Sequence, residues 1–567
     1  MEHVVSLVLR RMRRPLIVLI TAYAISILGY TLIEGVDDQG QPWRMGFFHA
    51  FYVVSYMGST IGFGELPYPF TDAQRLWTTV MIYLTVISWL YAIGSLLTIL
   101  RDENFRRVLA FSSFSRRAAA LREPFYVICG YGDTGSLIVR ELAERGIPAT
   151  VMDIDEDRLH ALELEDLPLY MPGLCADAND IANLRAAGLD HPACRGVVAV
   201  TNRDATNLKI ALTVKLLRPD MKVIARAEHR DSAANMASFG TDHIINPFET
   251  FGDLFGMLFH SPAMHLVHEW ITAIHDAPLE EFVTPPSGGW ILCGYGRFGK
   301  AVRRYLNFEG VDARVVEADP VSTDPPEKSV IGRGTEAHTL LEAGIRDAVG
   351  IIAGTDDDTN NLSILITAKD LNPKLFTVAR QNQIDNDDIF HAFDPDLLMQ
   401  PSTITARRML SLILTPLLAD FFELAREQDE AWANVLVSRV TGVVTDRSPQ
   451  TWEILLDEEQ APAVTTLIGE GLQIRLAHLL TDPHQRDRAL RCVCLLHRHG
   501  SRRTLLPDED LVLAPGDRLL FCGNARERSA MAFTCLNLNI LNFVVTGEDR
   551  PAGMVWSWLA RRRAATG

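Results

Sequence analysis

One glycine-rich pattern occurs twice in this sequence, and it limits the folds open to the chain more than any other feature. Each copy follows a short apolar run, which begins at Phe125 in the first copy and at Trp290 in the second. An acidic residue closes the next apolar run 23 residues after the first glycine, as Asp153 and as Glu317. The glycines are Gly130, Gly132 and Gly135 in the first copy and Gly294, Gly296 and Gly299 in the second.

This spacing is typical of a strand, a tight turn and a helix in a unit that binds dinucleotides. The first glycine allows the turn, the second lets the backbone approach a pyrophosphate, and the third lets the helix pack on the strand. The acid accepts hydrogen bonds from ribose hydroxyls and disfavours the additional phosphate of NADP. We therefore predict two Rossmann-type α/β units, each able to hold NAD or ADP with its phosphates at a helix N-terminus.

The repeat extends well beyond the glycines. Thr201 with Asn207 in the first copy matches Thr355 with Asn361 in the second, and a later polar residue followed by proline recurs 154 residues further along the chain. Agreement at so many positions is not a chance event, because a short motif would not carry its whole surroundings with it. Each copy is therefore a complete unit with its own trailing helices.

The two copies differ where a nucleotide would be held. Arg297 of the second copy stands where the first has Asp133, and Arg333 stands where the first has Asp177. A cation beside the pyrophosphate favours binding and a carboxylate opposes it, so we favour the second copy as the nucleotide site. The predicted site residues are Gly294, Tyr295, Gly296, Arg297, Phe298, Gly299, Glu317, Arg333 and Thr355 in the second copy, and Gly130, Gly132, Gly135 and Asp153 in the first.

Two uncharged runs precede the repeat, at residues 16–33 and 76–100. Both are long enough to cross about 30 Å of hydrocarbon as helices. A cleaved signal peptide is the alternative for the first run, but the second run and the lack of a small-residue cleavage site argue against it. The flanks before the first run and after the second are rich in arginine and are predicted to be cytoplasmic. These arginines are Arg10, Arg11, Arg13, Arg14, Arg101, Arg106, Arg107, Arg116, Arg117 and Arg122.

A third apolar stretch, residues 45–64, lies between these runs and ends in a threonine and two glycines. It is too short for a helical crossing once the glycine-bearing end is removed. A short helix that enters the membrane and returns as extended backbone fits it, because irregular backbone is tolerated there only where it lines a cavity. Glycines let such a backbone direct successive carbonyl groups towards one axis.

The end of this stretch, residues 60–65, resembles the selectivity-filter signature of potassium channels. The resemblance implies that backbone carbonyls, with the hydroxyl of the threonine, replace the hydration shell of K+, and that four chains surround one pore as a homotetramer. Two positions depart from the common signature: Phe63 stands where tyrosine is usual, and Glu65 replaces an aspartate. The predicted filter residues are Thr60, Ile61, Gly62, Phe63 and Gly64.

The second predicted span contains a glycine, Gly94, followed by Leu97 and Leu100. Gly94 is a candidate bend, and Leu97 with Leu100 could form an apolar constriction at the cytoplasmic mouth of the pore. Alternatively, Gly94 only permits close packing of helices.

The paired units resemble the regulator of K+ conductance (RCK, TrkA-N and TrkA-C type) domains of ligand-gated potassium channels over about residues 124–545. The resemblance implies trailing helices that cross between the two units, at residues 248–260 with 264–274 and at 403–414 with 417–427, and eight units per tetramer in a gating ring. We expect a multi-domain chain with an α-helical pore, two α/β Rossmann-type units and a small α+β C-terminal subdomain. The expected regions are a pore at 1–110 (spans 15–34 and 75–100, pore helix and filter 46–65), a linker at 111–123, units at 124–285 and 288–440, the C-terminal subdomain at 445–545 and a tail at 546–567.

Charge supports the same division. The 567 residues carry a net charge of −17. Residues 1–122 hold 12 Arg, no Lys and 8 acidic residues, a net of +4, so the remaining 445 residues carry −21. So acidic a part repels phosphates, which argues against a nucleic-acid partner. We expect a multi-pass protein of the inner (plasma) membrane with cytoplasmic termini and regulatory units.

Other chemistries are open at this point. Acidic clusters such as residues 356–358 and 385–388 offer hard ligands for Ca2+, but none has the twelve-residue EF-hand pattern, so Ca2+ is expected as a modulator without a location. His265 and His268 lie one helical turn apart beside Glu269, and we interpret them as a packed pair rather than a zinc site. The eight cysteines include no C-x-x-C pair.

Two other functions compete with a channel. A membrane-anchored NAD-dependent oxidoreductase would need a substrate pocket with a general acid or base, and no such set of residues is recognisable. A regulatory subunit of a potassium transporter would not need a filter of its own. We therefore predict a potassium-selective channel, not an enzyme, that is gated by NAD or ADP from the cytosol, with divalent cations as a second modulator.

Overall fold

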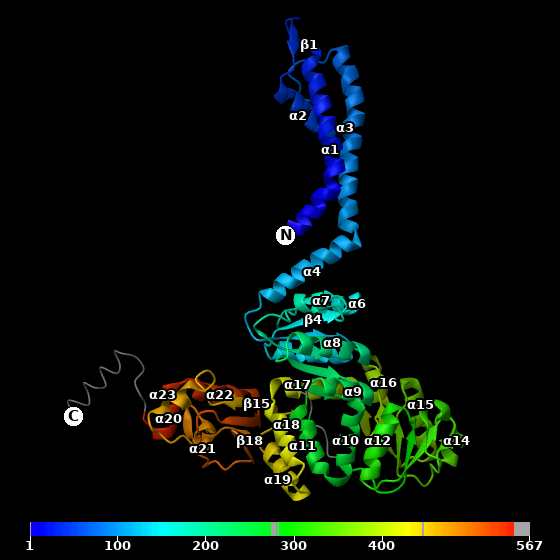
Figure 1. Ribbon diagram of the computed structural model, residues 1–567, viewed down its shortest axis with the longest axis vertical. Helices are drawn as coiled ribbons and strands as arrows, with labels where there is room; N and C mark the ends of the chain where they lie inside the picture. Colours follow the sequence, from blue (N-terminus) through cyan, green and yellow to red (C-terminus); the bar gives the residue numbers. More distant parts are fainter. Residues whose placement is uncertain (1, 274–278, 280–282, 445–446, 549–567) are drawn as a thin grey trace, which may run out of the picture. The chain divides into compact units, whose positions relative to one another are not determined.

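The computed structural model describes residues 2–273, 279, 283–444 and 447–548 (Figure 1). The chain divides into two compact units, Met1–Ala120 and Leu121–Gly567. Most of the expected tail and part of the connection before the second copy lie outside the described residues.

The first unit is built on two long apolar helices, α1 (Glu2–Leu32) and α3 (Asp72–Arg101). Their candidate spans, Met12–Leu32 and Asp72–Arg101, each have a mean hydropathy of 1.9. Polar groups join the two helices where water is scarce: the hydroxyls of Tyr30 and Thr78 lie 2.7 Å apart, and the Trp89 indole donates to the hydroxyl of Tyr23 at 2.6 Å. The prediction of two membrane-spanning helices is confirmed by their length and composition.

Shorter elements complete this unit. A hairpin of β1 (Glu34–Val36) and β2 (Pro42–Arg44) leads into α2 (Phe47–Gly58), and α4 (Glu103–Ala119) follows α3. Helix α2 buries Ala50, Val53 and Val54 against the spans. It is the predicted pore helix, and the segment that resembles a selectivity filter begins directly after it.

The second unit contains two parallel sheets of six strands, one for each copy of the repeat. Their strands are buried on both faces, as helix-covered parallel strands must be. The first sheet has the order β5-β4-β3-β6-β7-β8, with β3 (Phe125–Cys129), β4 (Ala149–Asp153), β5 (Gly173–Cys175), β6 (Cys194–Ala199), β7 (Lys222–Arg226) and β8 (His243–Ile245). The second has the order β11-β10-β9-β12-β13-β14, with β9 (Trp290–Cys293), β10 (Ala313–Glu317), β11 (Val330–Ile331), β12 (Gly350–Ala353), β13 (Phe376–Arg380) and β14 (Leu397–Met399).

Helices connect these strands in the same succession in both copies. In the first copy they are α5 (Asp133–Glu144), α6 (Glu156–Leu164), α7 (Ile181–Ala186), α8 (Asp204–Leu217) and α9 (Arg230–Ser238). In the second they are α12 (Arg297–Phe308), α13 (Pro320–Thr323), α14 (Ala337–Glu342), α15 (Asp358–Leu371), the 3-10 turn η1 (Ile384–Asn386) and α16 (Asp387–Phe393). The two copies of the sequence repeat therefore have the same fold.

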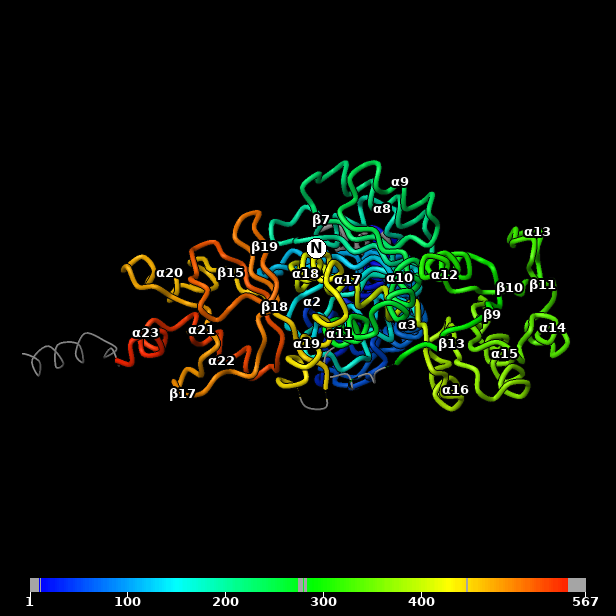
Figure 2. The backbone as a smooth tube through the Cα atoms, turned by 90° about the horizontal axis from the view of Figure 1, so that it is seen from below, coloured from blue at the N-terminus to red at the C-terminus, as the bar shows by residue number. Residues whose placement is uncertain are grey.

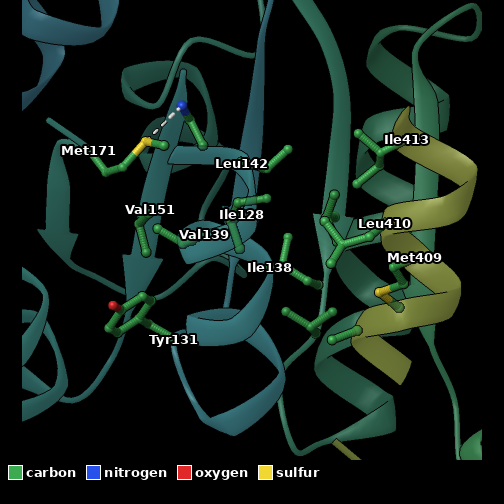
Figure 3. Packing of buried hydrophobic residues seen from close by; sticks show 14 of the residues in the cluster. Ile128, Tyr131, Ile138, Val139, Leu142, Val151, Met171, Met409, Leu410 and Ile413 are labelled. Carbon is green, nitrogen blue, oxygen red and sulfur yellow. Dashed lines mark hydrogen bonds between the residues drawn. The ribbon is translucent and has the colours of Figure 1, made fainter. Parts of the chain in front are cut away.

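Two helix pairs trail the sheets and lie between the two copies: α10 (Pro247–His260) with α11 (Pro262–Thr272), and α17 (Pro401–Leu414) with α18 (Leu417–Ala425) (Figure 2). Each copy lends a helix to the other, since α10 packs on α12 and α17 packs on α5. Figure 3 shows Ile138 and Leu142 of α5 facing Met409, Leu410 and Ile413 of α17 in one apolar cluster. This exchange ties the two nucleotide-type helices to the opposite copy.

The C-terminal part forms a separate small sheet. After α19 (Glu430–Thr441), four antiparallel strands run in the order β15-β20-β18-β19: β15 (Gln450–Leu455), β18 (Cys492–His499), β19 (Arg502–Leu505) and β20 (Arg518–Gly523). The remaining elements are α20 (Pro462–Gly469), α21 (Leu476–Leu479), β16 (Thr481–Asp482), β17 (Gln485–Ala489), α22 (Ala525–Leu536) and α23 (Leu538–Thr546). Helices α22 and α23 are also apolar enough to count as a bent span, but Met531 and Leu541 pack in the core of this subdomain. The predicted fold class is confirmed.

Candidate functional site: the filter segment and a pocket between the two copies

The predicted filter segment, residues 60–64, follows α2 and has no regular secondary structure. Its backbone alternates in handedness, since φ is positive at Thr60 (62°), Gly62 (65°) and Gly64 (72°) and not at the residues between them. Such alternation turns every second peptide unit and so favours carbonyl groups that share one side, as an ion-binding backbone requires. The amides of Ile61 and Gly62 both donate to the carbonyl of Tyr56, which anchors the segment to the end of α2.

A side chain braces this segment from behind. The Tyr52 hydroxyl of α2 donates to Oε2 of Glu65 at 3.0 Å. Phe63 has no hydroxyl to donate, whereas Glu65 accepts this hydrogen bond from a tyrosine of α2. In the predicted gate region, α3 is one helix through Gly94, and Leu97 is half exposed.

The glycine loops of both copies have the geometry that the motif requires. Gly130 (φ 110°) and Gly294 (φ 93°) occupy conformations that favour glycine. A Cβ atom at Gly135 would collide with the carbonyl oxygen of Gly130, and one at Gly299 would collide with that of Gly294. The third glycine therefore allows the helix to approach the strand in each copy.

The acid at the end of each second strand holds its loop in place. The carboxylate of Asp153 accepts from the Tyr131 amide at 2.6 Å and from the Asp155 amide at 2.9 Å. Glu317 does the same with the Tyr295 amide at 2.5 Å and the Asp319 amide at 2.8 Å. Both acids are almost buried, so their first role is to shape the loop, and only their remaining lone pairs are available to a ribose.

A polar cavity of about 580 Å³ lies beside the glycine loop of the first copy. That volume suits a small organic ligand. Its wall includes the first glycine loop, the end of β4 and the loop after β6, and residues of the second copy close it from the other side. The first copy contributes Gly130, Gly132, Asp153, Arg158, Thr201, Arg226, Glu228 and Phe248, and the second contributes Arg297, Asp356, Arg380, Asn382 and Ser402.

Arg297 is the first residue of α12, yet its side chain extends to the first copy. Its Nη1 atom lies 2.8 Å from Oε2 of Glu228, and its guanidinium lies 5.7 Å from the ring centre of Phe248. The packing of α10 on α12 brings these groups together. The residue predicted to serve the second copy's pyrophosphate therefore lines the first copy's pocket.

Arg380, at the end of β13, is a second guanidinium from the second copy in this pocket. It lies 4.9 Å from the ring centre of Phe248 and 5.5 Å from that of Phe298. Burial lowers the pKa of Arg380 to about 10, against the opposing effects of Glu228 and Asp356. The group stays charged at neutral pH and is partly buried, so an anion in the pocket could bind to it.

Arg158 of α6 is the cation nearest to the glycine loop. Its side chain lies 3.7 Å from the Asp153 carboxylate and 3.6 Å from that of Asp155, and a Cβ atom at Gly132 would lie 3.0 Å from its Nη1. Sequence reasoning missed Arg158 and Arg380. For Arg380 a signal existed, because Arg226 ends the equivalent strand of the first copy 154 residues earlier.

The other predicted residues of the second copy lie outside this cavity. Thr355 bonds with Asn361 at 2.7 Å, as Thr201 does with Asn207. Phe298 is buried between α10 and α12, and Arg333 is exposed on the loop after β11. The structure thus brings Arg297 into the pocket and leaves Arg333 out of it.

One carboxylate of the acidic cluster at residues 356–358 is engaged in hydrogen bonds within the protein. Asp358 accepts from the amides of Asn382 and Gln383 and from the side chain of Asn386, so it organises the loop after β13. Among the described residues, no group of three or more His, Cys, Asp or Glu side chains could hold a metal ion. His265 and His268 lie in the packed helices, where burial lowers the pKa of both.

Comparison with known proteins finds the same two copies of the repeat. The TrkA-N domain family matches residues 126–247 and again 290–401. The chain is 26% identical over 270 residues to "Potassium channel protein 1" of Methanocaldococcus jannaschii, which covers 47% of this chain and 76% of that protein. It is 26% identical over 206 residues to "Voltage-gated potassium channel Kch" of Escherichia coli, covering 36% and 47%.

Solved structures titled "GsuK Channel" and "GsuK channel bound to NAD" are 17% and 16% identical to this chain. Both matches span 94% of this chain. The first spans 99% of the solved chain with a TM-score of 0.49, and the second spans 100% of it with a TM-score of 0.45. At these TM-scores the likeness says nothing about ligands of this chain.

These relatives are potassium channels and not enzymes, in agreement with the prediction. The two apolar spans, the filter segment between them and the doubled family match point the same way. Two candidate membrane-spanning helices thus precede two matches to the TrkA-N domain family, and the relatives named above are potassium channels.

Proposed function

We propose that this chain assembles as a homotetramer into a K+-selective pore that an adenine nucleotide with at least two phosphates, ADP or NAD, opens from the cytosol. The observation that carries the gating proposal is the reach of Arg297 into the pocket of the opposite copy. A ligand in that pocket touches both copies at once, so it can change how they pack.

The filter segment supports the conducting part of the proposal. Positive φ at alternate positions from Thr60 to Gly64 and the anchoring of its amides to α2 suit a backbone that replaces water around K+. One chain supplies one such segment, and a ring of carbonyls needs several around an axis. The arginines in the first turns of α1 and after α3 support a cytoplasmic location for both ends of the membrane-spanning pair and for the regulatory copies that follow.

Electrostatics explain why the ligand should carry phosphates. Five arginines and six acidic residues line the pocket, so an anion would have to bind through the arginines; the acids are Asp133, Asp153, Asp155, Asp177, Glu228 and Asp356. Four of the arginines have an acidic neighbour or an aromatic ring, namely Arg158, Arg226, Arg297 and Arg380, and a diphosphate would take over part of these interactions. The arginines are Arg158, Arg203, Arg226, Arg297 and Arg380.

The placement of a nucleotide follows from the loop geometry. Its phosphates would lie at the N-terminus of α5, beside Gly132 and Arg158, and its ribose would face Asp153. Arg297 would then exchange Glu228 for a phosphate oxygen. We therefore place the regulatory site in the first copy. The repeat also predicts a second nucleotide site in the second copy, beside Glu317. Divalent cations stay a predicted modulator without a site.

Gating requires that the nucleotide bind one arrangement of the two copies more tightly than another. The exchanged helices α10 and α17 are the elements that such a change would move, because each packs on the nucleotide helix of the opposite copy. Single-channel recording with ADP or NAD on the cytosolic face tests the proposal. Open probability should rise with nucleotide, and currents that ignore both nucleotides would contradict it.

A further inference from the structure

Helix α4 follows α3 with only Asp102 between them, yet it is a separate helix. Helix α3 ends at Arg101, and Asp102 adopts extended backbone (φ −66°, ψ 119°). The Asp102 side chain accepts from the amide of Phe105 at 3.1 Å and so caps a new helix of 17 residues. Figure 1 shows α4 leaving α3 at an angle.

The start of α4 is fixed against the ends of both spans. Phe105 is buried in a small apolar cluster with Met12 of α1 and Ile99 of α3. The apolar face that begins with Phe105 continues one turn further with Val108 and Leu109, which are 45% and 40% exposed. Exposed apolar side chains in line with a membrane-spanning pair need an apolar environment.

Arginines surround this apolar face. Helix α4 contains four arginines and one acid, Glu103, whose ion pair with Arg107 is 3.9 Å long and exposed, and therefore weak. More arginines lie on α1 and at the end of α3, beside the cluster around Phe105. We name the whole set the arginine collar: Arg10, Arg13, Arg14, Arg101, Arg106, Arg107, Arg116 and Arg117.

We propose that α4 lies in the cytoplasmic interface of the membrane, with Val108 and Leu109 among acyl chains and the arginine collar bound to anionic lipid headgroups. A basic cluster directly cytoplasmic of a span is the arrangement that attracts anionic lipids, and an apolar stripe beside it lets a helix sink to the headgroup boundary. The chain offers both features on residues that follow the span without a linker.

The position of α4 can be measured with spin labels on the full chain in vesicles. Cys175 is the exposed native cysteine among eight and is first replaced by serine, since the others are buried. Single cysteines are then introduced as V108C, L109C and A110C and labelled with a nitroxide. Ala110 is the matched control, because it is exposed on the same helix but lies about 140° around it from Phe105.

The proposal predicts that labels at 108 and 109 are more accessible to oxygen than to a water-soluble nickel complex, and that the label at 110 shows the reverse. The immersion should deepen when phosphatidylglycerol replaces phosphatidylcholine. It should become insensitive to this exchange in the double variant Arg106→Gln/Arg116→Gln, whereas the control Arg502→Gln, on an exposed strand of the C-terminal subdomain, should behave as the parent.

Two results would overturn the proposal. Equal nickel access at all three positions would place α4 in water, and low access to both reagents with strong coupling between labels of neighbouring chains would mean that a second copy covers the face. Potassium flux from the same vesicles shows that each labelled variant is folded, so neither result can be assigned to a collapsed channel.

Discussion

The Nη1 atom of Arg297 lies 2.8 Å from Oε2 of Glu228, although the two residues belong to different copies of the repeat. Arg297 opens the nucleotide-type helix of the second copy, and Glu228 follows the fifth strand of the first. The ion pair therefore spans the boundary that a ligand in the pocket would also span. Under the proposed function, a ligand that breaks this ion pair would change how the two copies contact each other, as a ligand-driven gate needs.

Removing this guanidinium should weaken nucleotide binding. We expect Arg297→Ala to raise the dissociation constant for ADP about tenfold, or about 1.4 kcal/mol, because one charge-assisted contact to phosphate is lost from a partly exposed site. Isothermal titration of the full chain in detergent measures this. Arg333→Ala is the matched control and should bind as the parent does; an equal loss in both variants would refute the assignment of the pocket to the first copy.

Substitution of the second glycine in each copy tests the same assignment from the phosphate side. A Cβ atom at Gly132 would face Arg158 at 3.0 Å, whereas one at Gly296 would meet nothing within 4 Å. We expect Gly132→Ala to lower the affinity for ADP by at least tenfold by blocking the approach of the phosphates, and Gly296→Ala to leave it unchanged. The reverse order in the titrations would move the regulatory site to the second copy.

The third glycine should matter for stability instead. A Cβ atom at Gly299 would collide with the carbonyl of Gly294, so Gly299→Ala must push α12 away from β9. We expect a loss of about 2 kcal/mol and a lower melting temperature of the second unit, with Gly296→Ala close to the parent. Thermal unfolding followed by circular dichroism measures the difference, and equal melting temperatures would mean that the helix can shift freely.

The brace behind the filter gives a prediction about selectivity. Tyr52→Phe removes the hydrogen bond to Glu65 without changing the volume of α2, so the filter segment should loosen and admit more Na+. Reversal potentials in mixed K+ and Na+ solutions should show a few-fold rise in relative Na+ permeability. Tyr56→Phe alters the neighbouring ring, which packs edge-on against Tyr52, and should not change selectivity. Unchanged reversal potentials in Tyr52→Phe would show that the brace has no part in selectivity.

The packed helices between the copies should be sensitive to acid. Burial lowers the pKa of His265 to about 4, with the Glu269 carboxylate opposing the shift. The unfolded chain takes up this proton near pH 6.5 and the folded chain does not, so stability is complete above pH 6.5 and is lost between pH 6.5 and 4. Between pH 7.5 and pH 5 the free energy of unfolding should fall by about 2 kcal/mol, and the melting temperature should fall with it. His265→Leu should flatten the dependence, and an unchanged slope would exclude His265 as its source.

Some of this molecule could be predicted from the sequence because the physical signal is local. The spans follow from uncharged length, and the loops around Gly130 and Gly294 follow from a motif whose turn and helix lie within a few residues. The place of Arg297 could not be predicted in this way. Its side chain meets Glu228 only because α10 packs on α12, and such a contact between distant segments leaves no periodic pattern. Arg380 could have been predicted from the repeat, because its counterpart Arg226 ends the equivalent strand of the first copy.

The central claim is that a nucleotide held between the two copies opens the pore. The most direct measurement is the open probability of single channels in planar bilayers, recorded while ADP or NAD is added to the cytosolic face of the parent and of Arg297→Ala. Open probability of the parent should rise with ADP or NAD, and Arg297→Ala should need about tenfold more nucleotide for the same opening. Identical nucleotide dependence in both channels, or no dependence in the parent, would contradict the account.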